Sequence, residues 1–527
     1  MQPSVFSLLT SVFGAGRDRG RRDSLGNAAL FTAVAGALAY AHLAERSESV
    51  PEAPPCGGKI ILTQIPLPSL ADDPDQIGGG LVGRDLPTGS RIVEVDLAPG
   101  DNPVKTLTDG FAAAGRADLS FDGTHILFVA RRDAGEKNAV WEMRLADGEV
   151  RQVVTPPVGC EAVIYLSTLY TLEAGQPVRQ IAFCGPESAG GPNQFFTCRT
   201  DGSNVRQITF APEGVSDPYL LTDGRLLFSM GLPPDPALAN ESPASNRALF
   251  TINVDGTDIS PFAGVGDGPA WRRRPFEAPD NRVYFLESDA AQPSPGGSLV
   301  AVRRTKSLHS RRVIASSPDG HFHSASALED GRLLVSYRSG ADRVHASYGL
   351  YILQPDTGEF SGRMVDEPAW HEVDPVVVRP RPVPRGRSSV VNPNSNVGQL
   401  YCLDLGLSDE SGDPPTTDRR VAGVRVFSQN SGGGVLGTAL VESDGSFFLE
   451  VPARTPIRFE TLDDRGEVVR AMRSWMWIMP AERRGCIGCH EDRELTPPNR
   501  HVLALRKAPQ RIGVSSRPAL PVGGENP

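Results

Sequence analysis

The sequence predicts a mainly β protein, in which a β-propeller of about six blades is followed by a small β-sandwich-like domain. Short runs of β-branched and aromatic residues recur between Asp-Gly turns over residues 59–381, with a period of roughly 45 residues and no helical spacing of apolar side chains. The 527 residues include 55 glycines and 46 prolines, which suits a turn-rich globular chain of a few domains.

Residues 1–55 are predicted to be a signal peptide or an N-terminal membrane anchor, followed by a linker. Four arginines between Arg17 and Arg22 precede residues 24–44, which carry no acidic or basic side chain apart from one histidine. The tripeptide Ala39-Tyr40-Ala41 suits cleavage, whereas the apolar part is rather short for an uncleaved span. Both alternatives export the rest of the chain, so we expect an extracytoplasmic, periplasmic protein.

The propeller is predicted over residues 56–383 from copies of one repeat. The clearest copies begin at the turns Asp122-Gly123, Asp223-Gly224 and Asp330-Gly331, and each leads into two strand-length runs. Asp-Gly suits a hairpin turn because these residues tolerate positive φ. Residues 374–378 are interpreted as a last strand that completes the first blade. The copies resemble PD40-type, TolB-like propeller repeats, and residues 384–396 are predicted to be a linker.

The charge of the chain argues against a nucleic-acid partner. The formal net charge is −10 and the pI is near 5.5, whereas a nucleic-acid-binding protein normally has a basic face. The run Arg272-Arg273-Arg274 and the pair Arg419-Arg420 are interpreted as solvated surface or strand-edge charges.

A second β-rich domain is predicted over residues 397–512, with a disordered tail at residues 513–527. Strand-length apolar or alternating runs occupy residues 424–427, 437–441, 446–451 and 457–462, and Asp444-Gly445 suits a hairpin turn. This pattern predicts a small antiparallel sandwich.

The motif Cys486-Ile487-Gly488-Cys489-His490 is typical of a covalently attached c-type haem. The two thiols take up the two vinyl groups, and the histidine that follows binds the iron. The alternative is a structural zinc site, which needs four ligands, and the sequence has no second CxxC pair. We therefore predict one haem c, bound through Cys486, Cys489 and His490. Residues 475–480 are interpreted as an apolar wall for the macrocycle, with ordinary core packing as the alternative.

Export changes how the other cysteines are interpreted, because thiols tend to oxidise outside the cytoplasm. Cys184 and Cys198 lie on two apolar runs that a Gly/Pro/Ser-rich turn separates. This arrangement suits either a cross-hairpin disulfide or two buried thiols. The pairing of Cys160 stays open.

Several segments resemble the hydrazine synthase alpha-subunit-like family. The resemblance is strongest in residues 441–447, 477–482 and 486–491, and it extends to residues 62–66 and 321–325 of the propeller. It implies a propeller packed on a c-type haem domain, with a propeller histidine as the second axial ligand. The hydrazine-forming alpha subunit carries two c-type haems, whereas this chain has one CxxCH motif. We therefore assign the motif to the family's C-terminal, electron-transferring haem, and we do not expect hydrazine synthesis.

The sixth position of the iron decides between electron transfer and ligand chemistry. The family resemblance favours His323 as the distal ligand, with His321 as the alternative on the same strand. His501, Met476 and Met479 are further candidates close to the motif in sequence.

The sequence favours a periplasmic monohaem cytochrome that transfers electrons to or from a redox protein or a neighbouring subunit, with the propeller as docking platform. No Ser-His-Asp arrangement with a nucleophile elbow, HExxH motif or phosphate-binding glycine loop is present in the sequence. The alternative is a haem enzyme of the same group that acts on a small substrate at an open haem face or in the propeller channel.

Overall fold

The computed structural model describes residues 58–67, 86–97, 104–171, 176–233, 246–266, 268, 270–289, 296–316, 320–339, 347–361, 363–365, 367–407, 420–429, 434–488 and 501–514. The predicted N-terminal targeting segment lies outside these residues, as do Arg419, Cys489, His490 and the end of the predicted tail from residue 515. In the described part of the chain, no helix has both the length and the hydropathy needed to cross a membrane.

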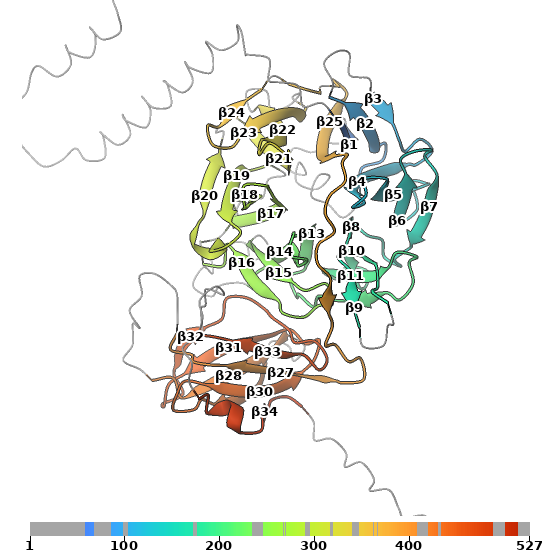
Figure 1. Ribbon diagram of the computed structural model, residues 1–527. Coiled ribbons are helices and arrows are strands. Elements are labelled where there is room, and N and C mark those ends of the chain that lie inside the picture. The colour runs from blue at the N-terminus through green and yellow to red at the C-terminus, as the bar shows by residue number, and fades with distance from the viewer. Residues whose placement is uncertain are drawn as a thin grey trace, which may run out of the picture. The chain divides into compact units, whose positions relative to one another are not determined.

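Six four-stranded blades form a propeller, which confirms the predicted fold class (Figure 1). From the innermost strand outward, the blades are β25-β1-β2-β3, β4-β5-β6-β7, β8-β10-β11-β12, β13-β14-β15-β16, β17-β18-β19-β20 and β21-β22-β23-β24. One pairing, Arg247 with Trp271, joins the fourth and fifth blades. The strand bounds are β1 Lys59–Pro66, β2 Arg91–Asp96, β3 Val104–Thr106, β4 Ala113–Leu119, β5 His125–Arg131, β6 Ala139–Arg144, β7 Val150–Val154, β8 Ala162–Tyr165, β9 Leu169–Tyr170, β10 Gln180–Pro186, β11 Asn193–Arg199, β12 Arg206–Gln207, β13 Val215–Leu220, β14 Leu226–Gly231, β15 Arg247–Ile252, β16 Ser260–Ala263, β17 Ala270–Glu277, β18 Arg282–Asp289, β19 Ser298–Arg303, β20 Arg312–Ala315, β21 Gly320–Ala327, β22 Leu333–Ser339, β23 Gly349–Gln354, β24 Glu359–Phe360 and β25 Trp370–Val377.

The ring closes through the predicted last strand. β25 pairs antiparallel with β1, from Pro66 against Trp370 to Ile60 against Val377. Two strands more than 300 residues apart in sequence thereby share the first blade, so the ring leaves no long strand edge unpaired at its closure. The Asp-Gly turns have the expected backbone, with φ of 75° at Gly123, 85° at Gly224 and 85° at Gly331.

The run Arg272-Arg273-Arg274 is not a solvated surface charge, and its interpretation as one is wrong. All three residues lie on β17, the innermost strand of the fifth blade, and Arg272 and Arg273 are 1% and 3% exposed. Arg272 forms an ion pair with Glu287 (2.8 Å), and Arg274 forms one with Asp374. Carboxylates on other strands offset the cost of burying these arginines. The sequence pattern does not show which residues supply these carboxylates.

The cross-hairpin disulfide is also absent from the described structure. Cys198 pairs with Ile181 across the β10–β11 hairpin, and Cys184 pairs with Phe195, so the two cysteines are out of register. Both are buried free thiols, as is Cys160.

The second domain consists of two four-stranded sheets, β33-β27-β30-β34 and β29-β28-β31-β32. Six strands pair antiparallel as predicted, but β33 runs parallel to β27 and β34 parallel to β30. The remaining bounds are β26 Arg387–Ser388, β27 Val397–Cys402, β28 Gly423–Ser428, β29 Val435–Leu440, β30 Phe447–Pro452, β31 Ile457–Leu462, β32 Val468–Ala471, β33 Arg483–Cys486, β34 Gln510–Arg511 and the short 3-10 helices η4 Ser307–His309 and η6 Ala504–Arg506.

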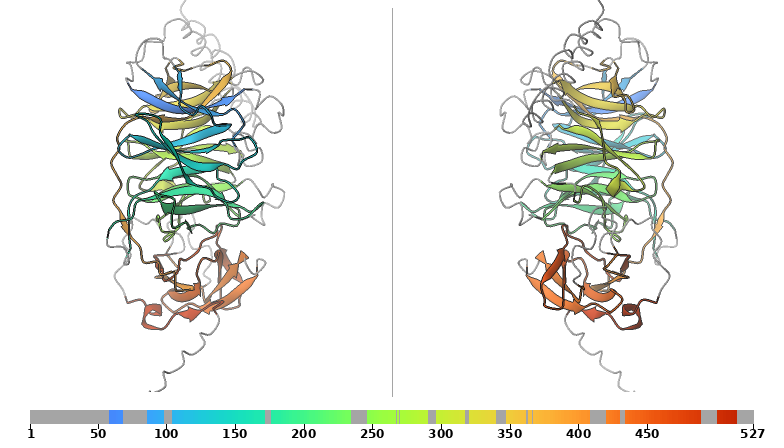
Figure 2. Two further views of the ribbon diagram at one scale, coloured as in Figure 1. Left: turned by 90° about the vertical axis from the view of Figure 1, so that its right-hand side faces the viewer. Right: turned by 90° about the vertical axis from the view of Figure 1, so that its left-hand side faces the viewer.

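The segment between the domains follows the propeller. In Figures 1 and 2 its orange trace runs along the propeller towards the second domain. Arg387 donates a side-chain hydrogen bond to the carbonyl of Asp223 (3.1 Å), and β26 pairs parallel with β9. The predicted linker is therefore held by side-chain and backbone contacts.

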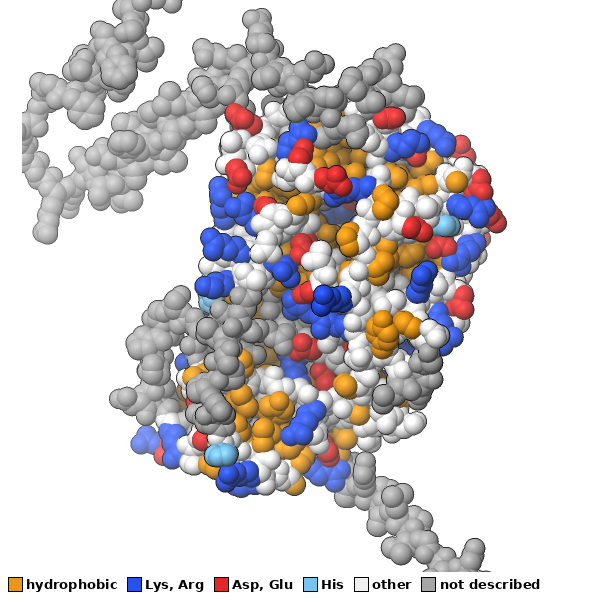
Figure 3. Space-filling model, in the orientation of Figure 1, with side chains coloured by type: hydrophobic (Ala, Val, Ile, Leu, Met, Phe, Trp, Pro, Cys, Tyr) orange, Lys and Arg blue, Asp and Glu red, His pale blue; other side chains and the backbone are white. Residues whose placement is uncertain are grey.

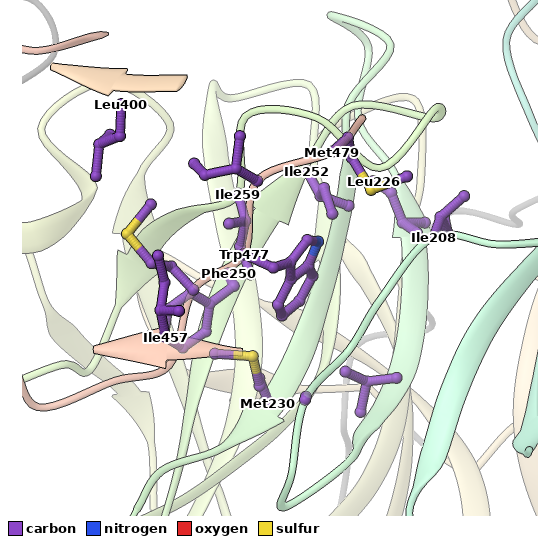
Figure 4. Close-up of a cluster of buried hydrophobic side chains, with 14 of the residues drawn as sticks. Ile208, Leu226, Met230, Phe250, Ile252, Ile259, Leu400, Ile457, Trp477 and Met479 are labelled. Carbon is purple, nitrogen blue, oxygen red and sulfur yellow. The ribbon is translucent and has the colours of Figure 1, made fainter. Parts of the chain in front are cut away.

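One hydrophobic cluster joins the two domains (Figure 4). Leu400, Ile457 and Trp477 of the second domain pack with Phe250 and other side chains of the third and fourth blades. Trp477 is 0% exposed, and its ring meets that of Phe210 edge to face at 6.0 Å between centroids. The chain just before the CxxCH motif is thereby fixed to the propeller.

Candidate haem attachment site

The first cysteine of the motif lies at the end of the edge strand β33. Cys486 pairs in register with Cys402 of β27, and its carbonyl accepts a hydrogen bond from Leu403 N (2.9 Å). The carbonyl of Ile487 accepts from Asp404 N (3.1 Å), so the parallel ladder continues past the strand. The backbone that leads towards Cys489 is therefore fixed to the sheet.

Two glycines of this segment allow its close approach to the neighbouring strand. A Cβ atom at Gly485 would lie 2.6 Å from the Tyr401 ring, and one at Gly488 would lie 2.4 Å from the carbonyl oxygen of Leu407. Real Cβ contacts are not this short, so a larger residue at either position would displace the segment.

Glu482 ties the start of the segment to the propeller. Its carboxylate accepts hydrogen bonds from Met479 N (2.6 Å) and from Asp258 N (2.8 Å), which lies in the β15–β16 turn. Burial raises the pKa of Glu482 to about 7, against the lowering effect of these hydrogen bonds and of Arg484. Glu482 fixes this segment through its contact with Asp258, which is distant in sequence, so the sequence alone did not indicate Glu482 as a site residue.

Residues 475–480 pack against the propeller, as the core-packing alternative expected. Trp475 Nε1 donates a hydrogen bond to Glu213 of the propeller (3.3 Å). Trp477, Ile478 and Met479 are at most 3% exposed, and Met479 lies against Gly256. The interpretation of this stretch as a wall for the macrocycle is not needed to explain its burial.

The chemistry of the motif fits a c-type haem. Cys486 is half-buried on the edge strand β33 and packs against the hydrophobic cluster that joins the two domains. Cys489 and His490 supply the second thiol and the imidazole, although their positions lie outside the described residues. The described residues contain no group of three or more His, Cys, Asp or Glu side chains that would suit a metal ion directly.

The structure does not bring His323 and Cys486 together. His323 lies on β21 in the propeller, whereas Cys486 lies on β33 in the second domain (Figure 1). The His323 side chain is 0% exposed, and its ring lies 5.2 Å from that of Tyr348. His321 lies on the same strand and is half-buried. Ligation by either histidine thus remains a prediction from the resemblance.

A series of hydrogen bonds connects the segment that contains His501 to the CxxCH motif. Leu403 N and Asp404 N donate hydrogen bonds to the carbonyls of Cys486 and Ile487, and Leu405 N donates one to the carbonyl of Gly445. The Asp444 carboxylate of that turn accepts a hydrogen bond from Leu503 N (2.8 Å). His501 is two residues before Leu503 and is exposed. Of the histidines considered as distal ligands, it is the one that these contacts bring to the same end of the sandwich as the motif.

The fold and the motif define a class: a six-bladed propeller with a β-sandwich domain that carries a CxxCH segment. Residues 418–491 match the family described as the hydrazine synthase alpha subunit middle domain. The hydrazine synthase subunit alpha of Kuenenia stuttgartiensis is 24% identical, over 77% of this chain and 63% of the relative. The chain thus spans less than two thirds of that relative's length. These matches show that the chain is similar to the hydrazine synthase alpha subunit, as its sequence motifs indicated.

One solved structure shares the fold of this chain. The hydrazine synthase of Kuenenia stuttgartiensis aligns with a TM-score of 0.70 and 22% identity, over 86% of this chain and 72% of that chain. TolB from Acinetobacter baumannii is less similar and aligns with a TM-score of 0.40 and 11% identity, over 61% of this chain and 66% of that chain.

The family match corrects one prediction. The region that ends in the CxxCH motif matches the middle domain of the alpha subunit, so its assignment to the family's C-terminal haem region is wrong. Without that assignment, the motif no longer excludes the catalytic type of haem.

Proposed function

We propose that this chain is an exported c-type haem subunit that transfers single electrons and docks on a neighbouring subunit or redox protein through its propeller. The arrangement at the end of the sandwich carries the proposal: the backbone at Cys486 is held by Leu403 and Asp404, and His501 lies at the same end. A c-type haem, when bound, supplies a one-electron couple that needs no acid–base residues.

Each residue of the site has one task in this proposal. Cys486 and Cys489 hold the porphyrin, and His490 binds the iron. His501 is the candidate for the second axial position, since its imidazole is exposed and its segment is connected by hydrogen bonds to the end of the domain that carries Cys486. Glu482 is a positioning residue, because it fixes the segment before the motif to the propeller.

The match to the middle domain favours a second candidate function. The relative's name is that of a synthase, and the matched region includes the CxxCH motif. In this alternative the iron keeps an open face, and the chain acts on a small substrate within a multi-subunit assembly. The two candidates differ in the sixth ligand of the iron.

Spectra of the purified protein test both candidates. The chain is expressed in a host with cytochrome c maturation, fractionated, and stained for covalent haem. We expect a periplasmic haem protein with a low-spin, six-coordinate spectrum. We also expect it to bind carbon monoxide only weakly. Absence of covalent haem would refute the proposal, whereas rapid carbon monoxide binding to the reduced protein would favour the enzyme.

Three histidine variants identify the distal ligand. His501→Ala is expected to give a high-spin spectrum, and His309→Ala, which removes an exposed propeller histidine, serves as the matched control. His323→Ala is expected to keep the wild-type spectrum. A low-spin spectrum that survives in His501→Ala and is lost in His323→Ala would restore the propeller histidine as the ligand.

A further inference from the structure

A cavity of about 1060 Å³ occupies the centre of the propeller. Its lining includes residues from the innermost strand of every blade: β4, β8, β13, β17, β21 and β25. Residues 379 and 381–385 of the connecting segment line it as well. Figure 3 shows Lys and Arg side chains next to Asp and Glu side chains over the middle of this face.

Four charged residues on these strands have a left-handed backbone. Arg116, Asp217, Arg274 and Asp374 have φ of 57°, 54°, 50° and 53°. Each lies at a β-bulge, where its strand has two residues opposite one residue of the next strand. A left-handed non-glycine residue costs roughly 1–3 kcal/mol and is concentrated at functional sites, and bulges re-aim side chains there. The same costly geometry in four blades therefore indicates a built site.

The cavity is basic although the protein is acidic. Eight arginines and six acidic residues line it, whereas the whole chain has a net charge of −10. Burial raises the pKa of Glu161 and of Glu213, which favours their neutral forms and makes the cavity more positive. A basic, enclosed channel attracts small anions.

Three arginines of the innermost strands line the channel. Arg273 is 3% exposed and packs over Trp271, with its guanidinium 4.8 Å from the ring centroid. Arg116 lies on β4 and Arg274 on β17; both line the cavity, and Arg116 donates a hydrogen bond to the carbonyl of Glu161. Asp374 forms an ion pair with Arg274 and so competes with any anion for it.

We propose that the central channel of the propeller binds a small oxyanion, a carboxylate or a phosphate, through Arg116, Arg273 and Arg274. Guanidinium groups form paired hydrogen bonds with the oxygens of both anions. Arg116 and Arg274 are at left-handed positions of innermost strands that line the channel, and Asp374 pairs with Arg274 when no ligand is bound. This site does not depend on the haem.

Calorimetric titration of the full-length haem protein tests this proposal. Inorganic phosphate and citrate are titrated separately at constant chloride concentration, so that the two anion chemistries are distinguished. We expect saturable binding of at least one of them. Lack of saturable binding of both, up to about 10 mM, would overturn the proposal.

Two variants with opposite expected effects guard against misfolding. Arg274→Gln is expected to weaken binding about tenfold by removing a charged donor. Asp374→Asn is expected to strengthen it several-fold, because it removes the competing carboxylate, and a folding defect would not improve affinity. Arg144→Gln removes an exposed arginine outside the cavity and is expected to change nothing. Unchanged affinity in Asp374→Asn, or equal losses in Arg274→Gln and Arg144→Gln, would refute the assignment.

Discussion

Replacing Trp477 with alanine is expected to separate the unfolding of the second domain from that of the propeller. The side chain is 0% exposed and lies in the cluster that joins the domains. Truncation of a buried tryptophan costs about 3–5 kcal/mol, which includes the edge-to-face contact with Phe210. The indole Nε1 has no hydrogen-bond partner among the described residues, so its removal returns about 1–3 kcal/mol. The net loss is about 2 kcal/mol.

Trp477→Phe is the matched variant, since it keeps most of the ring and removes the N–H group. We expect it to change stability by less than about 1.5 kcal/mol. Urea unfolding, followed by circular dichroism and by the haem absorbance, is expected to show one transition in wild type and in Trp477→Phe, and two in Trp477→Ala. Equal effects of the two substitutions, or a single unshifted transition in Trp477→Ala, would show that this cluster does not couple the domains.

Three further predictions concern single positions. Gly488→Ala is expected to reduce the yield of haem-stained protein and to cost about 1–3 kcal/mol, since its Cβ would meet Leu407; Gly135→Ala, whose Cβ meets nothing within 4 Å, is the control. Glu482 has a folded-state pKa of about 7, above its ordinary 4.5, so the stability linked to its protonation is complete below about pH 4.5 and is lost as the pH rises through 7. The free energy of unfolding of wild type, measured with urea, is therefore expected to fall by about 3 kcal/mol over this pH window. The same dependence on pH in Glu482→Gln would contradict this. The Cys184 thiol, buried and with its pKa raised, is expected to react with iodoacetamide only after denaturation, and mass spectrometry that shows it in a disulfide would contradict the structure.

The sequence alone determined the fold class and the motif. The Asp-Gly turns predicted the blades because hairpin turns require positive φ, a local demand that a few residue types meet. The run at residues 374–378 predicted the closing strand, since a ring needs one strand from the far end of the repeat region. The CxxCH motif is equally local, because vinyl attachment fixes the spacing of Cys486, Cys489 and His490.

The tertiary structure decided everything that depends on a partner from another blade or domain. Arg272, Arg273 and Arg274 look like solvated charges in the sequence, yet β17 buries Arg272 and Arg273. Glu287 pairs with Arg272, and Asp374 pairs with Arg274. The resemblance favoured His323 over His501, but the hydrogen bonds of the second domain connect the segment of His501 to the end that carries Cys486. The physical reason is that a turn or an attachment motif is specified by its own few residues, whereas the burial of a charge and the reach of a ligand are properties of the surroundings that folding creates.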